Sequence, residues 1–255
     1  MSKLPPQYKF LDLSDYGRPG GKLIANALQE TRFTPIHVTL LFVVSGFIAI
    51  YCIMNGYYIQ AAFFLVLKSV IDAADGELAR LKKTPSYVGR YLDSVCDLLL
   101  NLLFLISIMI VTDASAVVTF LAFIGLQLQG TLYNYYYVIL RNNVDGDSTS
   151  RVRENTTPKA LPGESQQAVN ILYKTYISLY GIFDVIIYYL DKNAHRSKPF
   201  PSWFMTILSV YGLGFQLLII AILLITGLEQ WIIPTILIMS LFIPVFIGIR
   251  KLLLK

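Results

Sequence analysis

Long apolar stretches dominate the chain and are separated by shorter polar segments. Each stretch has about 20 residues or more, which is the length that a helix needs to cross the hydrocarbon core of a bilayer. The connections after the first, third and fifth stretches are only a few residues long, so we expect these neighbours to form antiparallel pairs. The pattern predicts an all-α integral membrane protein with six transmembrane helices, at residues 36–57, 58–82, 89–112, 114–141, 203–227 and 230–253.

A shorter segment near the N-terminus also has apolar positions at helical spacing. Residues 20–33 place Lys22 and Arg32 away from these positions, which predicts an N-terminal helix lying in the membrane interface. This helix would belong to a cytoplasmic segment, residues 1–35. A plain cytoplasmic lead-in without a helix is the alternative.

The fourth connection, residues 142–202, combines a polar part with an apolar part. The polar part, residues 142–166, predicts a flexible cytoplasmic loop. Residues 167–190 are apolar enough for a seventh span, but Lys174 and Asp184 interrupt them. A seventh span would also carry the basic C-terminus to the outside. The sequence therefore favours a helix lying on the membrane surface.

The basic residues are distributed unevenly over the connections. Of the 21 Lys and Arg residues, five precede the first stretch, four flank the second connection, eight lie between Arg141 and Lys198, and three end the chain. Lys68 alone lies in the middle of a stretch. Because cytoplasmic loops carry the excess of positive charge, this distribution predicts that both termini are cytoplasmic.

Composition supports a membrane protein and explains the basic balance. Hydrophobic residues make up 55% of the 255 residues and charged residues only 15%, too apolar for an ordinary soluble domain. The length fits a single membrane domain, residues 1–255. The net charge of +5 follows from the cytoplasmic loops and from attraction to anionic lipid, so no nucleic-acid partner is expected.

Four carboxylates stand out because charged groups inside membrane segments are costly and usually functional. Asp72 and Asp75 lie near the inner end of the second stretch, and Asp93 and Asp97 near the inner start of the third. Steps of three and four place each pair on one helix face. Because the two helices are consecutive and antiparallel, the four groups are expected to converge at the cytoplasmic edge of the membrane.

Such a cluster needs cations, because four carboxylates repel one another strongly in a medium of low dielectric constant. Oxygen ligands suit hard ions such as Mg²⁺ or Mn²⁺, and two ions would form a natural clamp for phosphoryl chemistry. Lys68 precedes Asp72 by four residues and so lies on the same face. Our hypothesis is that Lys68 contacts donor phosphate or a carboxylate; a lysine snorkelling toward water is the alternative.

The spacing around these carboxylates resembles a known family signature. The run Asp72-x2-Asp75-Gly76-x2-Ala79-Arg80-x8-Gly89-x3-Asp93-x3-Asp97 is similar, at every defined position, to the signature of the CDP-alcohol phosphotransferase family. The six-span layout also matches that family. Upstream, Thr34-Pro35-Ile36-His37-Val38-Thr39 resembles a Pro-Asn-x-x-Thr motif of many members, but Ile36 stands in the place of the Asn.

The resemblance implies an activity, a cofactor and roles for individual residues. Members move a substituted phosphate from a CDP-linked donor to an acceptor hydroxyl and release CMP, in the synthesis of phospholipids or related phosphodiesters. Two Mg²⁺ or Mn²⁺ ions and a homodimer are implied as well. The implied residue roles are metal ligation by Asp72, Asp75 and Asp93, proton abstraction with possible metal contact by Asp97, and CDP binding by Gly76, Ala79, Arg80 and Gly89.

Several alternatives stay open at this level. The donor is either CDP-diacylglycerol with a polar alcohol acceptor, or CDP-choline or CDP-ethanolamine with a lipid alcohol acceptor; the Asp-Gly-Glu-Leu-Ala-Arg form of the motif favours the first. Arg141, Arg151 and Arg153 are candidates for binding an acidic acceptor, but they are equally typical topology signals. A cation channel or transporter with an acidic site is the alternative of another class. A bacterial inner membrane is the expected location.

Overall fold

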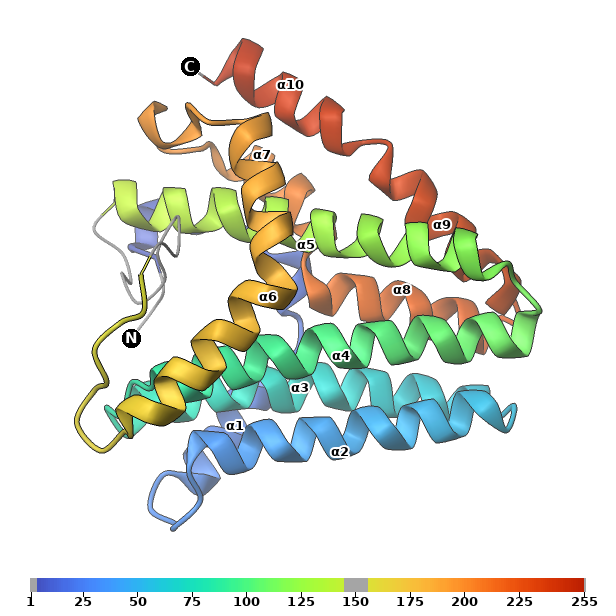
Figure 1. Cartoon of the computed structure of the whole chain (residues 1–255), viewed down its shortest axis with the longest axis horizontal. Helices are drawn as coiled ribbons and strands as arrows, with labels where there is room; N and C mark the ends of the chain where they lie inside the picture. Colours follow the sequence, from blue (N-terminus) through green and yellow to red (C-terminus); the bar gives the residue numbers. More distant parts are fainter. Residues whose placement is uncertain (1–3, 145–155, 255) are drawn as a thin grey trace.

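The computed structural model describes residues 4–144 and 156–254, and all regular structure in these ranges is helical (Figure 1). The long N-terminal half contributes α1 to α5, at Arg18–Leu28, Pro35–Met54, Tyr58–Leu81, Tyr87–Thr112 and Ala116–Asn143. The remainder contributes α6 to α10, at Gln166–Leu190, Ser202–Leu208, Leu213–Ile225, Ile232–Ser240 and Ile243–Leu253. Short 3₁₀ turns lie at Pro6–Tyr8, Leu13–Asp15, Ala194–Arg196, Ser209–Tyr211 and Glu229–Trp231.

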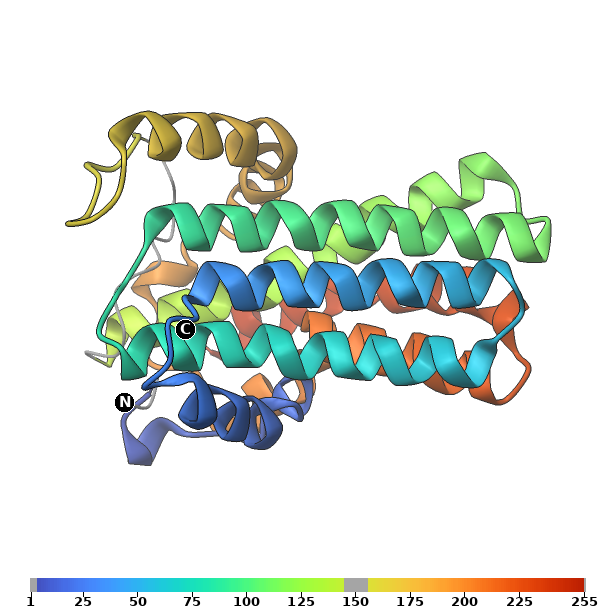
Figure 2. The same ribbon diagram turned by 90° about the horizontal axis from the view of Figure 1, so that it is seen from below.

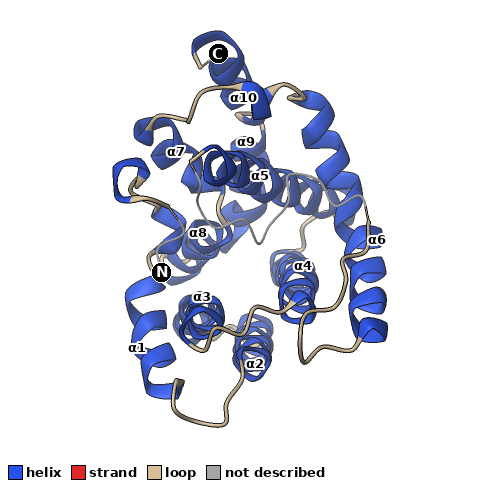
Figure 3. Ribbon diagram, turned by 90° about the vertical axis from the view of Figure 1, so that its left-hand side faces the viewer, coloured by secondary structure: helices blue, strands red, loops and turns tan. Residues whose placement is uncertain are grey.

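A bundle of antiparallel helices forms the body of the protein. Figure 2 shows α2, α3 and α4 running side by side along their length, and Figure 3 shows them end-on together with α5 and α8. The apolar core of the bundle is built from their facing sides and includes Leu65, Phe104 and Ile220, which are at most 2% exposed. Burial of such side chains, with tight packing of small residues, holds the helices together.

The ends of the central helices are set by local hydrogen bonds. The Thr34 side chain accepts from the backbone N–H of His37, the His37 ring bonds the Thr34 N–H in return, and Pro35 begins α2. The Ser86 hydroxyl accepts from the Gly89 N–H at 2.8 Å and so begins α4. These contacts satisfy N–H groups that have no partner within the helix. They set the start of α2, which packs against α3, and the start of α4, which carries Asp93 and Asp97.

Five helical segments are long and apolar enough to cross a membrane: α2, α4, α5, α6 and the run Glu229–Leu253, which contains α9 and α10. The pair α7 and α8 adds a sixth if it counts as one span. Helix α3 is 24 residues long and runs antiparallel alongside α2 (Figure 2). Its carboxylates and cations make it less apolar than these five segments. The protein is therefore a multi-pass integral membrane protein.

The stretch 203–227, expected as one straight helix, is bent by 53° between Ser202–Tyr211 and Leu213–Ile225. Gly212 has an extended backbone at the break. Both Gly212 and Gly214 lie against Ser14 of the N-terminal segment so closely that a Cβ at either position would collide with it. The break thus makes room for the N-terminal segment, which is far away in the sequence. Hydropathy along the chain does not predict such a contact.

Helix α6 crosses the bundle obliquely rather than running along it. It packs against α4 and α5 and lies across one flank in the end-on view (Figure 3). Only 11% of its most apolar stretch is buried within the protein. Its apolar outer side, with Ile171, Ile182 and Val185 exposed, fits contact with lipid. The surface-helix interpretation remains a prediction that this orientation supports.

The short N-terminal helix expected at residues 20–33 is present as α1, at Arg18–Leu28. It packs on α3, and a Cβ at Gly21 would lie 3.0 Å from the backbone of Ala73 and Ala74. The missing side chain at Gly21 permits this close approach of the two helices. Helix α1 therefore braces α3 beside the carboxylates.

Candidate active site

Three of the four expected carboxylates form a compact cluster. Asp72 and Asp75 of α3 and Asp93 of α4 each offer an oxygen atom, and these oxygen atoms all lie within 4.8 Å of one another. Helix α2 packs against both α3 and α4 and so holds the two carboxylate-bearing helices in place. Groups about 20 residues apart in the sequence are thereby brought together, as the sequence predicts. The side chains are partly buried, so the charges are only incompletely screened by water.

The donor set fits a hard divalent cation. Asp93 Oδ1 is buried and has no hydrogen-bond partner among the described residues. A buried carboxylate oxygen without a partner is costly, and a metal ion would compensate that cost. Asp75 Oδ2 accepts a hydrogen bond of 2.8 Å from the hydroxyl of Thr39 on α2. Three converging carboxylates, one of them oriented by a neighbouring helix, are a ligand set that Mg²⁺ or Mn²⁺ prefers.

The fourth carboxylate, Asp97, faces a lysine instead of this cluster. Lys68 is fully buried, forms an ion pair with Asp97, and lies 3.5 Å from Asp72 Oδ2. Its ammonium also lies 4.6 Å from the centroid of the Phe42 ring. The hypothesis that Lys68 contacts a carboxylate is thus confirmed by the geometry, and snorkelling toward water is wrong. A buried ammonium with two carboxylates in reach holds Asp97 in one orientation.

The cationic residue of the motif, Arg80, is turned along its own helix. Its guanidinium lies 3.0 Å from Glu77, and Glu77 also meets Arg18 at 3.5 Å. A Cβ at Gly76 would lie 3.6 Å from the Arg80 guanidinium, which is an ordinary van der Waals distance. The motif residues Gly76 and Arg80 line the cavity described next.

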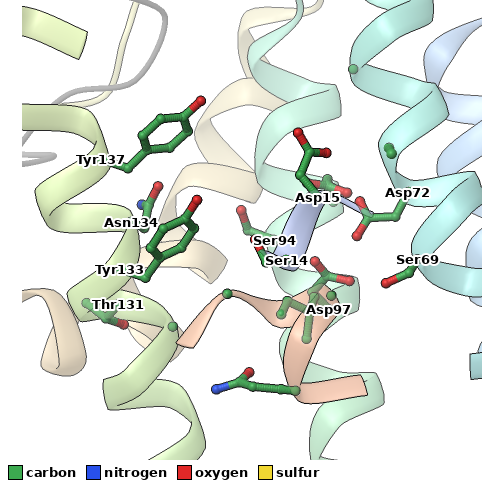
Figure 4. Close-up of a pocket in the computed structure, with 18 of the residues that line it drawn as sticks. Ser14, Asp15, Ser69, Asp72, Ser94, Asp97, Thr131, Tyr133, Asn134 and Tyr137 are labelled. Carbon is green, nitrogen blue, oxygen red and sulfur yellow. The ribbon is translucent and has the colours of Figure 1, made fainter. Parts of the chain in front are cut away.

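A cavity of about 510 Å³ opens beside the carboxylates (Figure 4). Asp72 and Ser69 of α3 lie on one side, and Tyr133, Asn134 and Tyr137 of α5 lie on the opposite side. A space of this size suits a small ligand or part of a larger one. All four signature aspartates line it, at Asp72, Asp75, Asp93 and Asp97.

Not every expected residue reaches this cavity. Ala79 and Gly89 are absent from its lining. The Gly89 N–H instead donates a hydrogen bond to the hydroxyl of Ser86, the N-cap residue of α4. Arg141 does line it, is 5% exposed, and lies over the Tyr137 ring with 5.3 Å between its guanidinium carbon and the ring centroid. Arg151 and Arg153 lie outside the described residues.

Several residues that support or line the site lie outside the motif. Thr39, quoted above only as part of an upstream resemblance, proves to be the hydrogen-bond donor to Asp75. Glu164 of the fourth connection accepts from the Ser86 hydroxyl at 2.7 Å and from the Val88 N–H at 2.8 Å, so this end of the loop is fixed to the start of α4. The N-terminal segment also reaches the cavity through Asp12, Ser14 and Asp15. Only the tertiary contacts identify these groups.

Comparison with known proteins gives one result. Residues 23–157, slightly more than half of the chain, match the family model described as CDP-alcohol phosphatidyltransferase. This range contains all eight residues of the signature and helices α2 to α5. No curated protein gives a significant match to the chain.

Proposed function

We propose residue roles and substrates for this chain. The chain belongs to the CDP-alcohol phosphatidyltransferase family and therefore transfers a phosphate group from a CDP-alcohol donor with release of CMP. The observation that carries the roles is the convergence of Asp72, Asp75 and Asp93 beside the Lys68–Asp97 pair, on one wall of a polar cavity. The cavity would hold the reacting diphosphate and the acceptor hydroxyl together, which lowers the entropic cost of the reaction.

Asp72, Asp75 and Asp93 would hold Mg²⁺ or Mn²⁺, and we propose two ions with Asp97 as a further contact. When bound, the ions neutralise the diphosphate and stabilise the CMP leaving group. Thr39 fixes the Asp75 carboxylate through its hydroxyl, so that less reorganisation is needed when the site fills. Arg80 and Gly76, together with Ala79 and Gly89 near the helix ends, are proposed to form the CDP-binding part of the site.

Asp97 is proposed as the general base. Its carboxylate takes the proton from the acceptor hydroxyl, the acceptor oxygen attacks the phosphorus atom of the donor, and the bond to CMP breaks, with CMP leaving as the anion. Lys68 orients Asp97 through their ion pair, because the Lys68 side chain is fully buried while the Asp97 carboxylate stays accessible from the cavity. Direct attack needs no covalent enzyme intermediate.

For the substrates, we propose CDP-diacylglycerol as donor and a small polar alcohol as acceptor. The polarity of the cavity supports this choice, because its walls combine carboxylates with hydroxyl, amide and guanidinium groups. Arg141 is proposed to contact the acceptor, with Arg151 and Arg153 as further candidates. CDP-choline or CDP-ethanolamine with a lipid alcohol is the second candidate pair, supported only by the family activity.

Membrane placement follows from the positions of the basic residues. The ends of α3, α5 and α10 and the start of α4 lie at the carboxylate end of the bundle and carry Arg80, Lys82, Lys83, Arg90, Arg141, Arg250 and Lys251. We propose that this end, with both termini and the active site, faces the cytoplasm, in a bacterial inner membrane. We further propose a homodimer, which chemical cross-linking in native membranes would test.

The decisive experiment measures CMP release by the purified chain in lipid nanodiscs with Mg²⁺. CDP-diacylglycerol and CDP-choline are each offered with a panel of polar and lipid alcohols. We expect CMP release with CDP-diacylglycerol and a polar alcohol, and a fall of at least about a hundredfold in Asp97→Asn. The matched control Asp113→Asn, exposed at the far end of α4, should keep wild-type rates. CMP release only with CDP-choline would overturn the proposed donor.

The same preparation tests the cation transporter alternative. Reconstituted vesicles are loaded with a Mg²⁺ indicator, and ion flux is measured beside CMP release. We expect no flux above that of empty vesicles. Flux that survives Asp97→Asn, with no CMP formed from any CDP donor, would overturn the proposed enzyme activity.

A further inference from the structure

The N-terminal segment Asp12–Asp15 is partly buried and lies against α5 and the break that separates α7 from α8. The Leu13 N–H donates to the Ser209 hydroxyl at 2.9 Å, and the Tyr133 hydroxyl of α5 donates to Asp12 at 2.5 Å. Asp12 also accepts from the backbone N–H and the hydroxyl of Ser14, at 3.1 and 2.7 Å. These bonds tie the segment to two helices that are far from it in the sequence.

The receiving helix is shaped for this segment. Gly212 and Gly214 approach Ser14 so closely that no side chain fits at either position, and a Cβ at Gly214 would lie 3.4 Å from the Ser69 hydroxyl of α3. Ser69 is three residues before Asp72. The segment therefore reaches the carboxylate-bearing helix and forms a wall of the active-site cavity, which Asp12, Ser14 and Asp15 line.

This wall is not part of the matched family region. The match covers residues 23–157, whereas the segment lies before it and the α7–α8 break lies after it. The two parts that build the wall are thus features of this chain that the family signature does not assign. The signature accounts for the carboxylates and for the proposed CDP site. Selection of the acceptor therefore depends on cavity residues outside the signature, such as those of this wall.

The side chains that surround this segment, from both sides of the cavity, suit the binding of hydroxyl groups. Many are neutral and able to donate and accept hydrogen bonds, and the carboxylates Asp12 and Asp15 can accept as well. The neutral groups are Ser14, Ser69, Ser94, Thr131, Tyr133 and Asn134. Figure 4 shows Ser14, Ser69 and Ser94 between Asp72 and the polar side chains of α5. A ligand with several adjacent hydroxyls can satisfy such groups, whereas an alkyl chain would leave them without partners.

We propose that the segment Asp12–Asp15 is the acceptor-selecting wall of the site and that it selects a small polyol. The proposal rests on the proposed function, because it takes the cavity as the place where the acceptor alcohol binds. Asp12 is the positioning residue for this selection: its carboxylate accepts hydrogen bonds from Ser14 and Tyr133 and so holds these two residues at the cavity wall. A site that bonds several hydroxyls rejects alcohols that lack them.

The test uses the purified full chain in nanodiscs with CDP-diacylglycerol. Glycerol, myo-inositol, glycerol 3-phosphate, choline and a long-chain alcohol are compared as acceptors, so that the contribution of a phosphate is separated from that of the polyol. We expect a polyol to be used in preference to choline and the long-chain alcohol. Asp12→Asn should raise the KM for that polyol about tenfold or more, while the donor KM changes by less than about twofold.

Further variants keep the test decisive. Ser14→Ala and Tyr133→Phe remove one hydroxyl each and should also raise the polyol KM, and Asp113→Asn is the matched control that should not. Choline or the long-chain alcohol as the preferred acceptor, or an unchanged polyol KM in folded Asp12→Asn and Ser14→Ala, would overturn the proposal while leaving the transferase activity intact. Absence of CMP release with every donor and acceptor would instead contradict the proposed function itself.

Discussion

At the scale of single residues, the buried pair Lys68–Asp97 is the most informative feature. A lysine deep in a membrane helix needs a partner, and here it has Asp97 and Asp72. The pairing separates Asp97 from the cluster of Asp72, Asp75 and Asp93. The structure thus groups three of the four carboxylates into a cluster that could hold a metal ion and pairs the fourth with a buried lysine.

Removing the ammonium should damage both activity and stability. In Lys68→Met the Asp97 carboxylate loses its cationic partner and is left buried, which costs about 3–5 kcal/mol when a buried pair is broken. We expect CMP release to fall at least about tenfold and thermal unfolding to occur at a lower temperature. Lys22→Met, on the exposed side of α1, is the matched control. Wild-type kinetics in Lys68→Met would exclude a role for this residue.

Metal dependence belongs to the three-carboxylate cluster. Treatment with EDTA should abolish CMP release, and Mg²⁺ or Mn²⁺ should restore it, because the diphosphate charge is otherwise uncompensated. Asp93→Asn removes the carboxylate whose Oδ1 has no hydrogen-bond partner in the described structure. This variant should need a much higher Mg²⁺ concentration for half-maximal activity, measured by titration. Activity that persists in EDTA would contradict the proposed ligand set.

At the scale of the elements, the site depends on how α2 supports α3. The Thr39 hydroxyl reaches across to Asp75, and α1 supports α3 on another side through Gly21. Such contacts orient the ligands without touching the substrate. The motif on α3 and α4 is therefore only part of the machinery, and α2 contributes a positioning residue from outside it.

The α2–α3 hydrogen bond can be tested by a pair of substitutions. Thr39→Val keeps the shape but removes the donor to Asp75, so apparent Mg²⁺ affinity should fall about tenfold to a hundredfold. Thr39→Ser keeps the hydroxyl and should retain most of the wild-type affinity. The measurement is activity against Mg²⁺ concentration for both variants. Equal Mg²⁺ dependence of the two would show that this bond does not orient the ligand.

At the scale of the whole molecule, the carboxylates, the basic helix ends and both ends of the described chain lie toward the same end of the bundle (Figure 1). The polar cavity opens there, whereas the opposite end carries short turns such as the one at Asp113. This polarity is what a membrane enzyme with a water-soluble substrate on one side requires. It leads to a prediction about topology and about α6.

Single cysteines introduced into a variant with Cys52 and Cys96 replaced by Ser would report the topology. Asp113→Cys should react with a membrane-impermeant maleimide in intact cells, because the proposed topology places its turn on the outer side. Lys159→Cys and Lys192→Cys, on either side of α6, should react only after permeabilisation. Labelling of Lys192→Cys in intact cells would mean that α6 spans the membrane, and inverted labelling of the other two would overturn the cytoplasmic placement.

The sequence by itself determined the membrane spans in outline and the clustering of the carboxylates Asp72, Asp75 and Asp93. A long apolar stretch predicts a transmembrane helix, because backbone N–H and C=O groups must be hydrogen-bonded inside the bilayer. Helical spacing places Asp72 and Asp75 on one face of α3, and the consecutive antiparallel helix α4 brings Asp93 to the same end of the bundle. The contact of Lys68 with a carboxylate follows from the same spacing and is confirmed.

Only the tertiary structure decided the rest of the site. The bend at Gly212, the bond from Thr39 to Asp75, and the insertion of Asp12–Asp15 beside Tyr133 join segments far apart in the chain. Periodicity describes one helix at a time and carries no information about such partners. The N-terminal wall of the cavity, where we propose that the acceptor binds, therefore depends on long-range packing, whereas the carboxylate cluster is predicted by the local spacing of the motif.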